Sequence, residues 1–174
     1  MSEIITRVDK FDTEMGPIEK MEAHYKGTLH RAFSILVFNS KNELLLQKRA
    51  LSKYHSPGLW TNTCCSHPRF GEKLEDAIYR RLKEEMGFTC KLKEAFSFTY
   101  KVQFDDGLFE HEFDHVFIGR YDGDLLPNKD EVDDYKWVNL KELKKDIQKN
   151  PEAYTYWFKV LFDKAEDILQ ENYT

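Results

Sequence analysis

The stretch from Trp60 to Gly87 constrains the fold and the chemistry of this chain more than any other part of it. Within it, Cys65 precedes His67 by two residues, just ahead of a segment that ends in paired carboxylates. Apolar residues recur along that segment at spacings of three and four, which predicts one face packed on a core; they are Leu74, Ala77, Ile78, Leu82 and Met86. Because Gly87 stands where a C-terminal cap is needed, the pattern predicts a helix over about residues 72–86.

The composition indicates one globular domain, residues 1–174, with a sizeable core, because 41% of the residues are hydrophobic. The net charge of −5 comes from interspersed acids and bases, which argues against nucleic acid or a membrane as a partner. Three cysteines, two of them adjacent, form a poor disulfide framework and suit a reducing compartment. Neither a membrane-spanning apolar run nor a signal-peptide pattern is present. We therefore expect a cytoplasmic monomer.

Two hairpins and a set of helices are predicted along the chain. Residues 29–38 have the composition of a buried strand, and a polar turn joins them to a second strand at 43–48. Alternating apolar residues over 98–104 predict a half-buried strand that pairs back with 108–118. The other expected elements are a short strand and a loop in residues 1 to about 20, a loop at 50–63, a short strand at 135–138, and helices at about 140–148 and 152–171. This order predicts an α/β (α+β) fold with a mixed β-sheet and helices packed on it.

A pair of acids in the second hairpin is a candidate metal site. Because strand side chains alternate, Glu110 and Glu112 project to one face about 7 Å apart, where they repel unless a cation or a proton lies between them. The imidazoles that could complete the site are those of His24, His30 and His67. Three nitrogen and two oxygen donors suit Mn, Fe, Co or Zn better than Ca. On spacing alone, a solvated pair of acids with ordinary histidines is the better interpretation, and alternation places His111 and His115 on the opposite face.

Several other side chains have a functional interpretation beside a structural one. Cys65 could border the pocket of His67, although a free cysteine is more often an inert small hydrophobe, as we assume for Cys64 and Cys90. Basic side chains are usually solvated surface charges, but a convergent group can bind a phosphate. The basic candidates are Lys20, Arg49, Lys53 and Arg81. The aromatic residues Trp60, Tyr100 and Trp157 would ordinarily belong to the core.

Two motifs resemble a known family. The run from Arg80 to Gly87 resembles the end of a Nudix box, and the run from Thr61 to Pro68 resembles its type 1 isopentenyl-diphosphate isomerase branch. Further similarities lie at His30-Arg31-Ala32-Phe33-Ser34, at Glu110-His111-Glu112 and at Trp157, so the resemblance covers about residues 20–160. It implies a single-domain Nudix-like fold in which helices sandwich a mixed β-sheet. The first 20 or so residues would be an extension that packs over the site.

The resemblance also implies an activity and a set of site residues. The activity is the interconversion of isopentenyl and dimethylallyl diphosphate by protonation and deprotonation of the alkene. Cys65 and Glu112 would carry the protons, Tyr100 would hydrogen-bond Glu112, and Trp157 would face the carbocation. The metal ligands of the family match His24, His30, His67, Glu110 and Glu112, which would hold one divalent transition metal such as Mn²⁺ or Zn²⁺. Glu85 would hold the Mg²⁺ of the small-molecule diphosphate, and the grip on the diphosphate falls on Lys20, Arg49, Lys53 and Arg81.

Two departures from the hydrolase form of the box bear on the reaction. Ser66 stands where the first glycine of the box belongs, and Arg81 replaces the glutamate after its arginine. The box has therefore lost a metal carboxylate and gained a cation, which argues against hydrolysis. The alternatives are still a Nudix hydrolase of a nucleoside diphosphate derivative and a catalytically silent Nudix-like binding module.

Overall fold

The computed structural model describes residues 2–173, which form two compact units. The first unit comprises the chain up to Ser34, Cys65–Arg81 and Glu94–Phe117. The second comprises Ile35–Cys64, Leu82–Lys93 and the chain from Ile118 onward. The chain passes repeatedly from one unit to the other, so some strands and one helix begin in one unit and end in the other.

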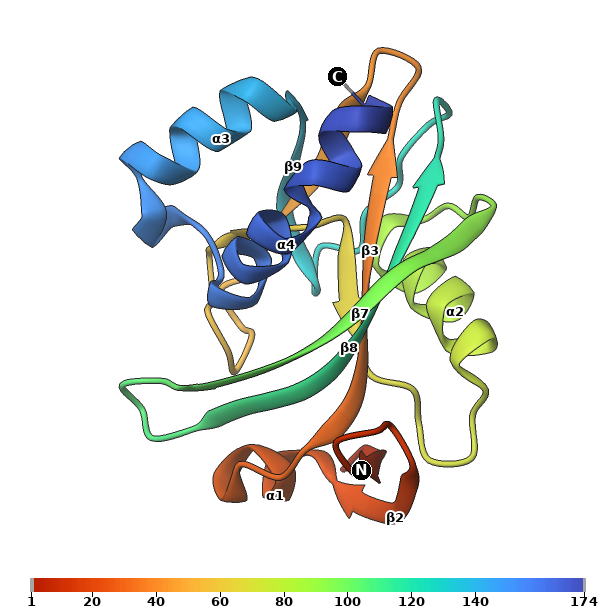
Figure 1. Cartoon of the computed structure of the whole chain (residues 1–174), viewed down its shortest axis with the longest axis vertical. Helices are drawn as coiled ribbons and strands as arrows, with labels where there is room; N and C mark the ends of the chain where they lie inside the picture. The colour runs from red at the N-terminus through yellow and green to blue at the C-terminus, as the bar shows by residue number, and fades with distance from the viewer. Residues whose placement is uncertain (1, 174) are drawn as a thin grey trace. The chain divides into compact units, whose positions relative to one another are not determined.

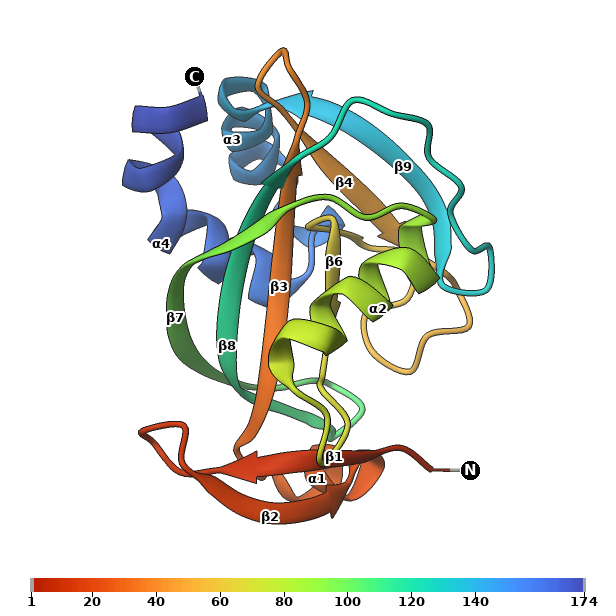
Figure 2. The ribbon, with the colours of Figure 1, turned by 90° about the vertical axis from the view of Figure 1, so that its right-hand side faces the viewer.

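The described residues form strands and helices that confirm the predicted mixture of a β-sheet with helices (Figures 1 and 2). The strands are β1 (Ile4–Val8), β2 (Glu14–Glu19), β3 (His30–Phe38), β4 (Glu43–Arg49), β5 (Trp60–Thr61), β6 (Cys64–Ser66), β7 (Leu92–Gln103), β8 (Phe109–Arg120) and β9 (Val132–Asn139). The helices are α1 (Lys20–Lys26), α2 (Leu74–Met86), α3 (Leu140–Lys149), the 3₁₀ turn η1 (Pro151–Ala153) and α4 (Tyr156–Tyr173).

In the first unit, the N-terminal segment is a hairpin followed by a short helix. β1 pairs antiparallel with β2, and Arg7 pairs with His30 at the start of β3. Helix α1 is defined by its ends, because the Glu19 carboxylate accepts a hydrogen bond from the Glu22 N–H and Gly27, with φ of 67°, forms a left-handed cap. Figure 2 shows β1, β2 and α1 side by side. The short strand predicted within residues 1 to about 20 is β1, but the loop expected after it contains the second strand, β2.

In the second unit, β4 and β9 form a long antiparallel ladder that runs from Glu43 opposite Asn139 to Arg49 opposite Val132. The Asn139 side chain also accepts a hydrogen bond from the Lys141 N–H, so it ends β9 and caps α3. Helices α3 and α4 lie side by side in both ribbon views. The residues that α4 buries are Trp157, Phe158, Leu161, Phe162, Ala165 and Leu169.

The strongest sequence signals are confirmed and the weaker boundaries are corrected. The helix predicted at about 72–86 is α2, its core-facing stripe is buried from Ala77 onward, and Gly87 has a φ of 77°. Both predicted hairpins are present, but β7 begins already at Leu92. The region predicted as a loop at 50–63 contains β5, and β6 was not predicted. These two strands are only two and three residues long, too short for a periodic signal.

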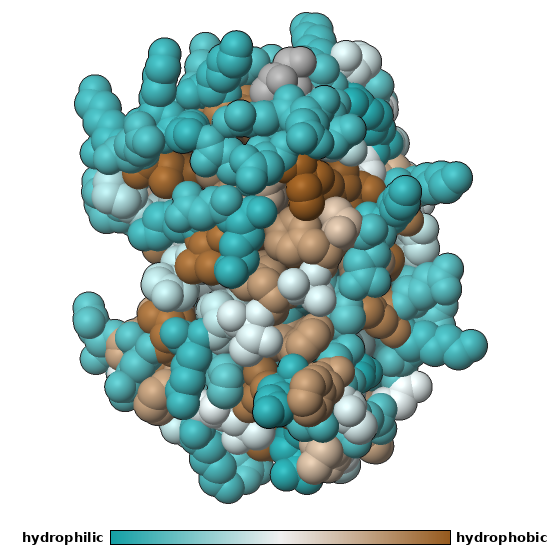
Figure 3. Space-filling view, viewed as in Figure 1, coloured by the Kyte–Doolittle hydropathy of each residue, from teal (hydrophilic) through white to brown (hydrophobic). Residues whose placement is uncertain are grey.

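The exposed surface is largely hydrophilic on the face shown in Figure 3, with apolar side chains in small patches between charged ones. The large apolar residues that are exposed include Phe11, Leu51 and Leu126. Among residues 2–173, every helix falls short of the length and apolarity that a membrane crossing demands.

Gly87 and Gly107 form a matched pair for a stability test. Their φ values are 77° and 84°, but a Cβ on Gly87 would overlap the backbone carbonyl of Leu126, whereas one on Gly107 would meet no atom within 4 Å. We expect Gly107→Ala to lower the free energy of unfolding by about 1–2 kcal/mol, the cost of the left-handed backbone. Gly87→Ala should cost about 1–3 kcal/mol more because of the overlap. Urea unfolding of both variants measures the difference, and equal losses would contradict this assignment.

Candidate active site

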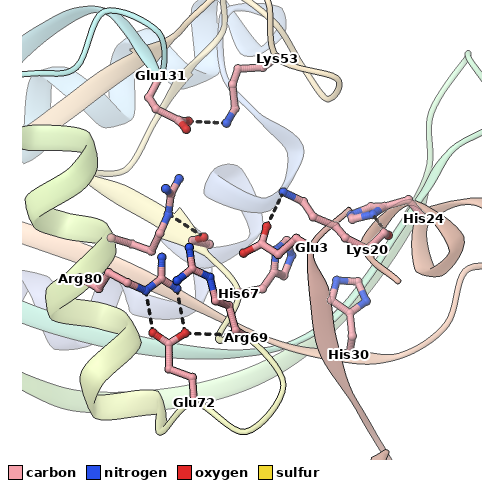
Figure 4. Close-up of polar contacts among 12 residues, drawn as sticks. Glu3, Lys20, His24, His30, Lys53, His67, Arg69, Glu72, Arg80 and Glu131 are labelled. Carbon is pink, nitrogen blue, oxygen red and sulfur yellow. Dashed lines mark hydrogen bonds and ion pairs between the residues drawn. The ribbon is translucent and has the colours of Figure 1, made fainter. Parts of the chain in front are cut away.

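Five buried side chains of the first unit meet in one cluster. Their nitrogen and carboxylate oxygen atoms all lie within 4.8 Å of one another. The members are His24 from α1, His30 from the start of β3, His67 from the segment after β6, and Glu110 and Glu112 from β8. Figure 4 shows how the three imidazoles, which are far apart in the sequence, are brought together. The structure thus places all five residues predicted as metal ligands in one site.

Backbone carbonyls orient two of the imidazoles. His24 Nδ1 lies 2.5 Å from the carbonyl oxygen of Lys20, and His30 Nδ1 lies 2.8 Å from that of Thr28. A carbonyl oxygen only accepts hydrogen bonds, so Nδ1 carries the proton in both rings. The Nε2 atoms are therefore the ones that the neutral rings offer to a metal, an arrangement typical of metal-binding histidines.

Those Nε2 atoms face carboxylate oxygens. His24 Nε2 lies 2.6 Å from Glu110 Oε1, and His67 Nε2 lies 3.0 Å from Glu112 Oε1. His30 Nε2 is 3.6 Å from Glu112 Oε1, and this buried atom has no hydrogen-bond partner among residues 2–173. The contact of His67 is a hydrogen bond when its Nε2 carries the proton. In neutral His24 and His30, by contrast, the Nε2 lone pair faces a carboxylate and is repelled by it, so these two contacts call for a proton or a cation between the atoms.

The proton supply of the cluster is limited. Burial is the largest influence on His67 and lowers its pKa to about 3, despite the opposing effect of Glu112. The neighbouring charges of His30 and Lys20 lower this pKa further. Burial also lowers the pKa of His30, but Glu112 and Glu110 outweigh it and raise the pKa overall. His67 is therefore neutral near pH 7 and adds no positive charge beside the two carboxylates. A divalent cation would supply that charge, and the three nitrogen and two oxygen donors fit a transition metal.

Tyr100 and Asp114 extend the polar site. The Tyr100 hydroxyl donates a hydrogen bond of 3.3 Å to Glu110 Oε2, and hydrogen bonding with Glu112 is also among the causes that raise the pKa of Tyr100. Burial, followed by the charges of Glu112 and Glu110, raises the pKa of Tyr100 well above its usual value, so the phenol keeps its proton.

The sequence analysis missed Asp114 as a member of this polar group. Asp114 is buried on β8, and its carboxylate accepts a 2.7 Å hydrogen bond from the Ser34 hydroxyl. Burial and the charge of Glu112 raise the pKa of Asp114 well above its usual value. The signal was available, because Asp114 continues the alternation of Glu110 and Glu112.

The other two histidines of β8 lie outside the cluster, as predicted. His111 Nδ1 lies 2.9 Å from the carbonyl oxygen of Gly27. His115 contacts two carboxylates, with Nδ1 2.5 Å from Glu94 and Nε2 2.8 Å from Asp12. Both side chains therefore have structural partners in the first unit.

The three cysteines differ in environment. Cys64 is fully buried, and its carbonyl oxygen accepts a 2.7 Å hydrogen bond from the Asn62 side chain. Cys65, which adjoins it, is partly exposed. Burial raises the pKa of the Cys90 thiol to about 11, which keeps it protonated and unreactive. Cys65 and Cys90 are both partly exposed, and Cys65 is the one that precedes His67 by two residues.

Each of the four predicted diphosphate-binding side chains has a protein partner. In the first unit, Lys20 pairs with Glu3 at 3.3 Å, and Arg81 Nε donates to the Ser66 hydroxyl at 3.0 Å. The partners in the second unit are Glu131 for Lys53, at 2.5 Å, and the His55 carbonyl for Arg49 Nε, at 3.0 Å. Figure 4 includes the pairs of Lys20 and Lys53. The Arg49 guanidinium also lies 5.1 Å from the centroid of the Trp157 ring, a cation–π distance.

Two carboxylates of the box have different partners. Arg80 grips Glu72 with two hydrogen bonds of 2.6 and 2.8 Å, and the Arg69 N–H adds a third (Figure 4). The hydrogen bond from Arg80 is the main reason why the pKa of Glu72 is lowered. Glu85 is buried and accepts a 2.9 Å hydrogen bond from the neutral amide of Gln47. Glu72 therefore links the loop after His67 to α2. Gln47 is neutral, so its hydrogen bond to Glu85 brings no positive charge to that carboxylate.

Comparison with known proteins identifies the family. Residues 28–158 match the model of the NUDIX domain. The chain is 54% identical over 165 residues to isopentenyl-diphosphate Delta-isomerase 2 of Aromatoleum aromaticum, which covers 95% of this chain and 87% of that protein. It is 56% identical over 163 residues to isopentenyl-diphosphate Delta-isomerase 2 of Photorhabdus laumondii, with coverage of 94% and 92%. This chain belongs to the isopentenyl-diphosphate Delta-isomerase family. Its Nudix resemblance is therefore confirmed.

Solved structures support the fold of this isomerase-family chain. DR0079 from Deinococcus radiodurans superposes with a TM-score of 0.76 at 20% identity, covering 99% of this chain and 100% of that one. A MutT protein from Methanosarcina mazei gives a TM-score of 0.67 at 21% identity, covering 84% and 96%. At such low identity these similarities concern the Nudix fold alone.

The cluster predicts which variants lose metal. His67→Ala and Glu110→Gln each remove one of five donors, so the dissociation constant for the bound metal should rise at least about tenfold. His111→Ala is the matched control, because it removes an imidazole from the same strand outside the cluster and should keep its metal. Elemental analysis after dialysis against a limiting metal buffer measures this. Full occupancy in both cluster variants would exclude these residues as ligands.

Proposed function

We propose that this protein interconverts isopentenyl diphosphate and dimethylallyl diphosphate. The observation that carries the proposal is the buried cluster of three histidines and two glutamates in a chain whose relatives bear the name isopentenyl-diphosphate Delta-isomerase. A buried site that could hold a metal, in the same unit of the chain as the thiol of Cys65 and the phenol of Tyr100, suits proton transfer to and from carbon.

The reaction moves a double bond without any net change in oxidation state. A proton is added to one face of the alkene, which leaves a tertiary carbocation, and a second proton is removed from the allylic carbon on the opposite face. We assign these two protons to Cys65 and Glu112. Tyr100 keeps its proton at neutral pH, so it can donate a hydrogen bond to the carboxylates of the site. The direction of the reaction decides which carrier gives and which takes.

We assign two metal sites. His24, His30, His67, Glu110 and Glu112 would hold Mn²⁺ or Zn²⁺, whose role is to fix Glu112 and to adjust its acidity. Glu85 would hold Mg²⁺ together with the oxygens of the diphosphate, because Mg²⁺ is commonly bound by one or two carboxylates plus phosphate.

Basic and aromatic side chains would bind the rest of the substrate. We assign the diphosphate to Lys20, Arg49, Lys53 and Arg81. We assign the carbocation to the ring of Trp157, a buried indole that already attracts the guanidinium of Arg49 at 5.1 Å. An aromatic face stabilises a cation in a site from which water is excluded.

The N-terminal segment belongs to the same functional unit in this proposal. Helix α1 supplies His24 to the cluster, and the charge of Lys20 affects the pKa of His67. We therefore retain residues 1–174 as a single functional domain with an N-terminal extension over the site.

Hydrolysis is the less favoured alternative. A Nudix hydrolase needs several box carboxylates on Mg²⁺ to activate water, but Arg81 occupies one such position and Arg80 neutralises Glu72. A silent binding module is also less favoured, because burying two carboxylates among three imidazoles is costly unless they hold a cation.

A single incubation separates these possibilities. Isopentenyl diphosphate mixed with the metal-loaded protein in D₂O with Mg²⁺ should take up deuterium and equilibrate with its dimethylallyl isomer, with no release of phosphate. Proton NMR of the vinyl and allylic methyl signals, with a parallel phosphate assay, measures all products. Phosphate release without deuterium uptake would point to a hydrolase, and the absence of both signals would favour a binding module.

The adjacent cysteines provide the control. Cys65→Ala should abolish deuterium uptake because a proton carrier is lost, whereas Cys64→Ala should keep turnover within about tenfold, or about 1.4 kcal/mol of barrier. Circular dichroism should show both variants folded. If Cys65→Ala keeps its turnover and Cys64→Ala loses it, the proton carrier has been assigned to the wrong thiol.

A further inference from the structure

Gln47 occupies a fully enclosed position on β4 in the second unit. Its amide nitrogen donates one hydrogen bond of 2.8 Å to the carbonyl oxygen of Thr63 and another of 2.9 Å to Glu85 Oε2. Both partners are oxygens that accept hydrogen bonds. The side-chain amide therefore has one allowed orientation, because a flipped amide would place its own oxygen against two acceptors.

The carbonyl at one end of this link is itself fixed. The Thr63 hydroxyl donates a 2.7 Å hydrogen bond to the Leu45 carbonyl and accepts a 2.9 Å hydrogen bond from the Val37 N–H. Thr63 is thereby fastened to two neighbouring strands, β3 and β4. Through its two hydrogen bonds, the Gln47 amide connects the Thr63 carbonyl to the carboxylate of Glu85 at the end of α2.

The chemical character of the link matters as much as its geometry. Arg80 orients Glu72 and also brings a positive charge that lowers the affinity of that carboxylate for another cation. The amide of Gln47 orients Glu85 without bringing a charge. A neutral donor of this kind orients the carboxylate without offsetting its negative charge, so the donor does not weaken the attraction of the carboxylate for a metal ion.

We propose that Gln47 is a positioning residue for Glu85, which it holds ready for the Mg²⁺ that accompanies the diphosphate. The inference rests on the proposed function and extends it to a residue that has no direct contact with substrate or metal. A buried carboxylate oxygen is the type of donor that Mg²⁺ prefers, and the diphosphate supplies further oxygens. Ligands held by a rigid supporting residue bind metal more tightly than mobile ones.

Calorimetry with inorganic diphosphate tests this on the full-length protein with its His/Glu site loaded. Gln47→Met keeps the length of the side chain and removes both donors. With Mg²⁺ present, the dissociation constant for diphosphate should rise about tenfold, the effect expected for a lost hydrogen bond to a charged group. In buffer depleted of free divalent ions, the dissociation constant of Gln47→Met for diphosphate should differ from that of the wild type by less than twofold. Gln148→Met, which removes an exposed amide on α3, should match the wild type in both arms.

A double-mutant cycle with Glu85→Gln tests whether Gln47 affects diphosphate binding through Glu85. In that background, Gln47→Met should have less than a twofold effect, because the carboxylate that it positions is gone. If Gln47→Met fails to fold, as thermal melting would show, Gln47→Asn keeps a buried amide and carries the same measurement. Equal losses with and without Mg²⁺, or a tenfold loss that persists in the Glu85→Gln background, would overturn the positioning role.

The outcome also separates this inference from the proposed function. Wild-type protein that isomerises in D₂O, paired with a Gln47→Met variant that binds Mg²⁺ and diphosphate normally, would refute only the role of Gln47. Wild-type protein that binds diphosphate equally well with and without Mg²⁺ would refute the assignment of Mg²⁺ to Glu85, and the role of Gln47 with it.

Discussion

The burial of Glu110 and Glu112 among three imidazoles is the constraint on which the rest of the first unit depends. Two carboxylates removed from water repel each other strongly, and His67, whose pKa burial lowers to about 3, adds no positive charge near pH 7. A divalent cation resolves the conflict. The elements that converge here, namely α1, the start of β3, the segment after β6 and β8, therefore have a shared energetic reason to do so.

The carboxylates of the box show how one motif serves two purposes. Arg80 fastens Glu72 to α2, so this acid stabilises the loop that presents His67. Glu85, at the C-terminal end of the same helix, accepts a hydrogen bond from the neutral amide of Gln47 instead. The side chain that follows Arg80 is a cation, Arg81, bound by the Ser66 hydroxyl. The two acids of this motif therefore differ in the charge of the side chain that orients them.

The sequence could reveal what depends on local repetition. Alternation placed Glu110 and Glu112 on one face, and the spacing of apolar residues with Gly87 located α2. It could not reveal α1, because a carboxylate cap and a glycine define this short helix, and it brings His24 to the site through tertiary packing. Asp114 lay within reach of the same alternation rule. The role of Gln47 could not be foreseen, because its partners are 16 and 38 residues away.

The buried cluster of histidines and glutamates implies a metal held by imidazole nitrogen. X-ray absorption spectroscopy at the metal edge, on protein loaded with one equivalent of Mn²⁺ or Zn²⁺, reports the donor atoms directly. The geometry predicts a first shell of three imidazole nitrogens with carboxylate oxygens, and outer-shell scattering from the rings. In His67→Ala, the imidazole contribution should fall to two. A first shell of oxygen alone, without ring scattering, would show that the imidazoles do not hold the metal.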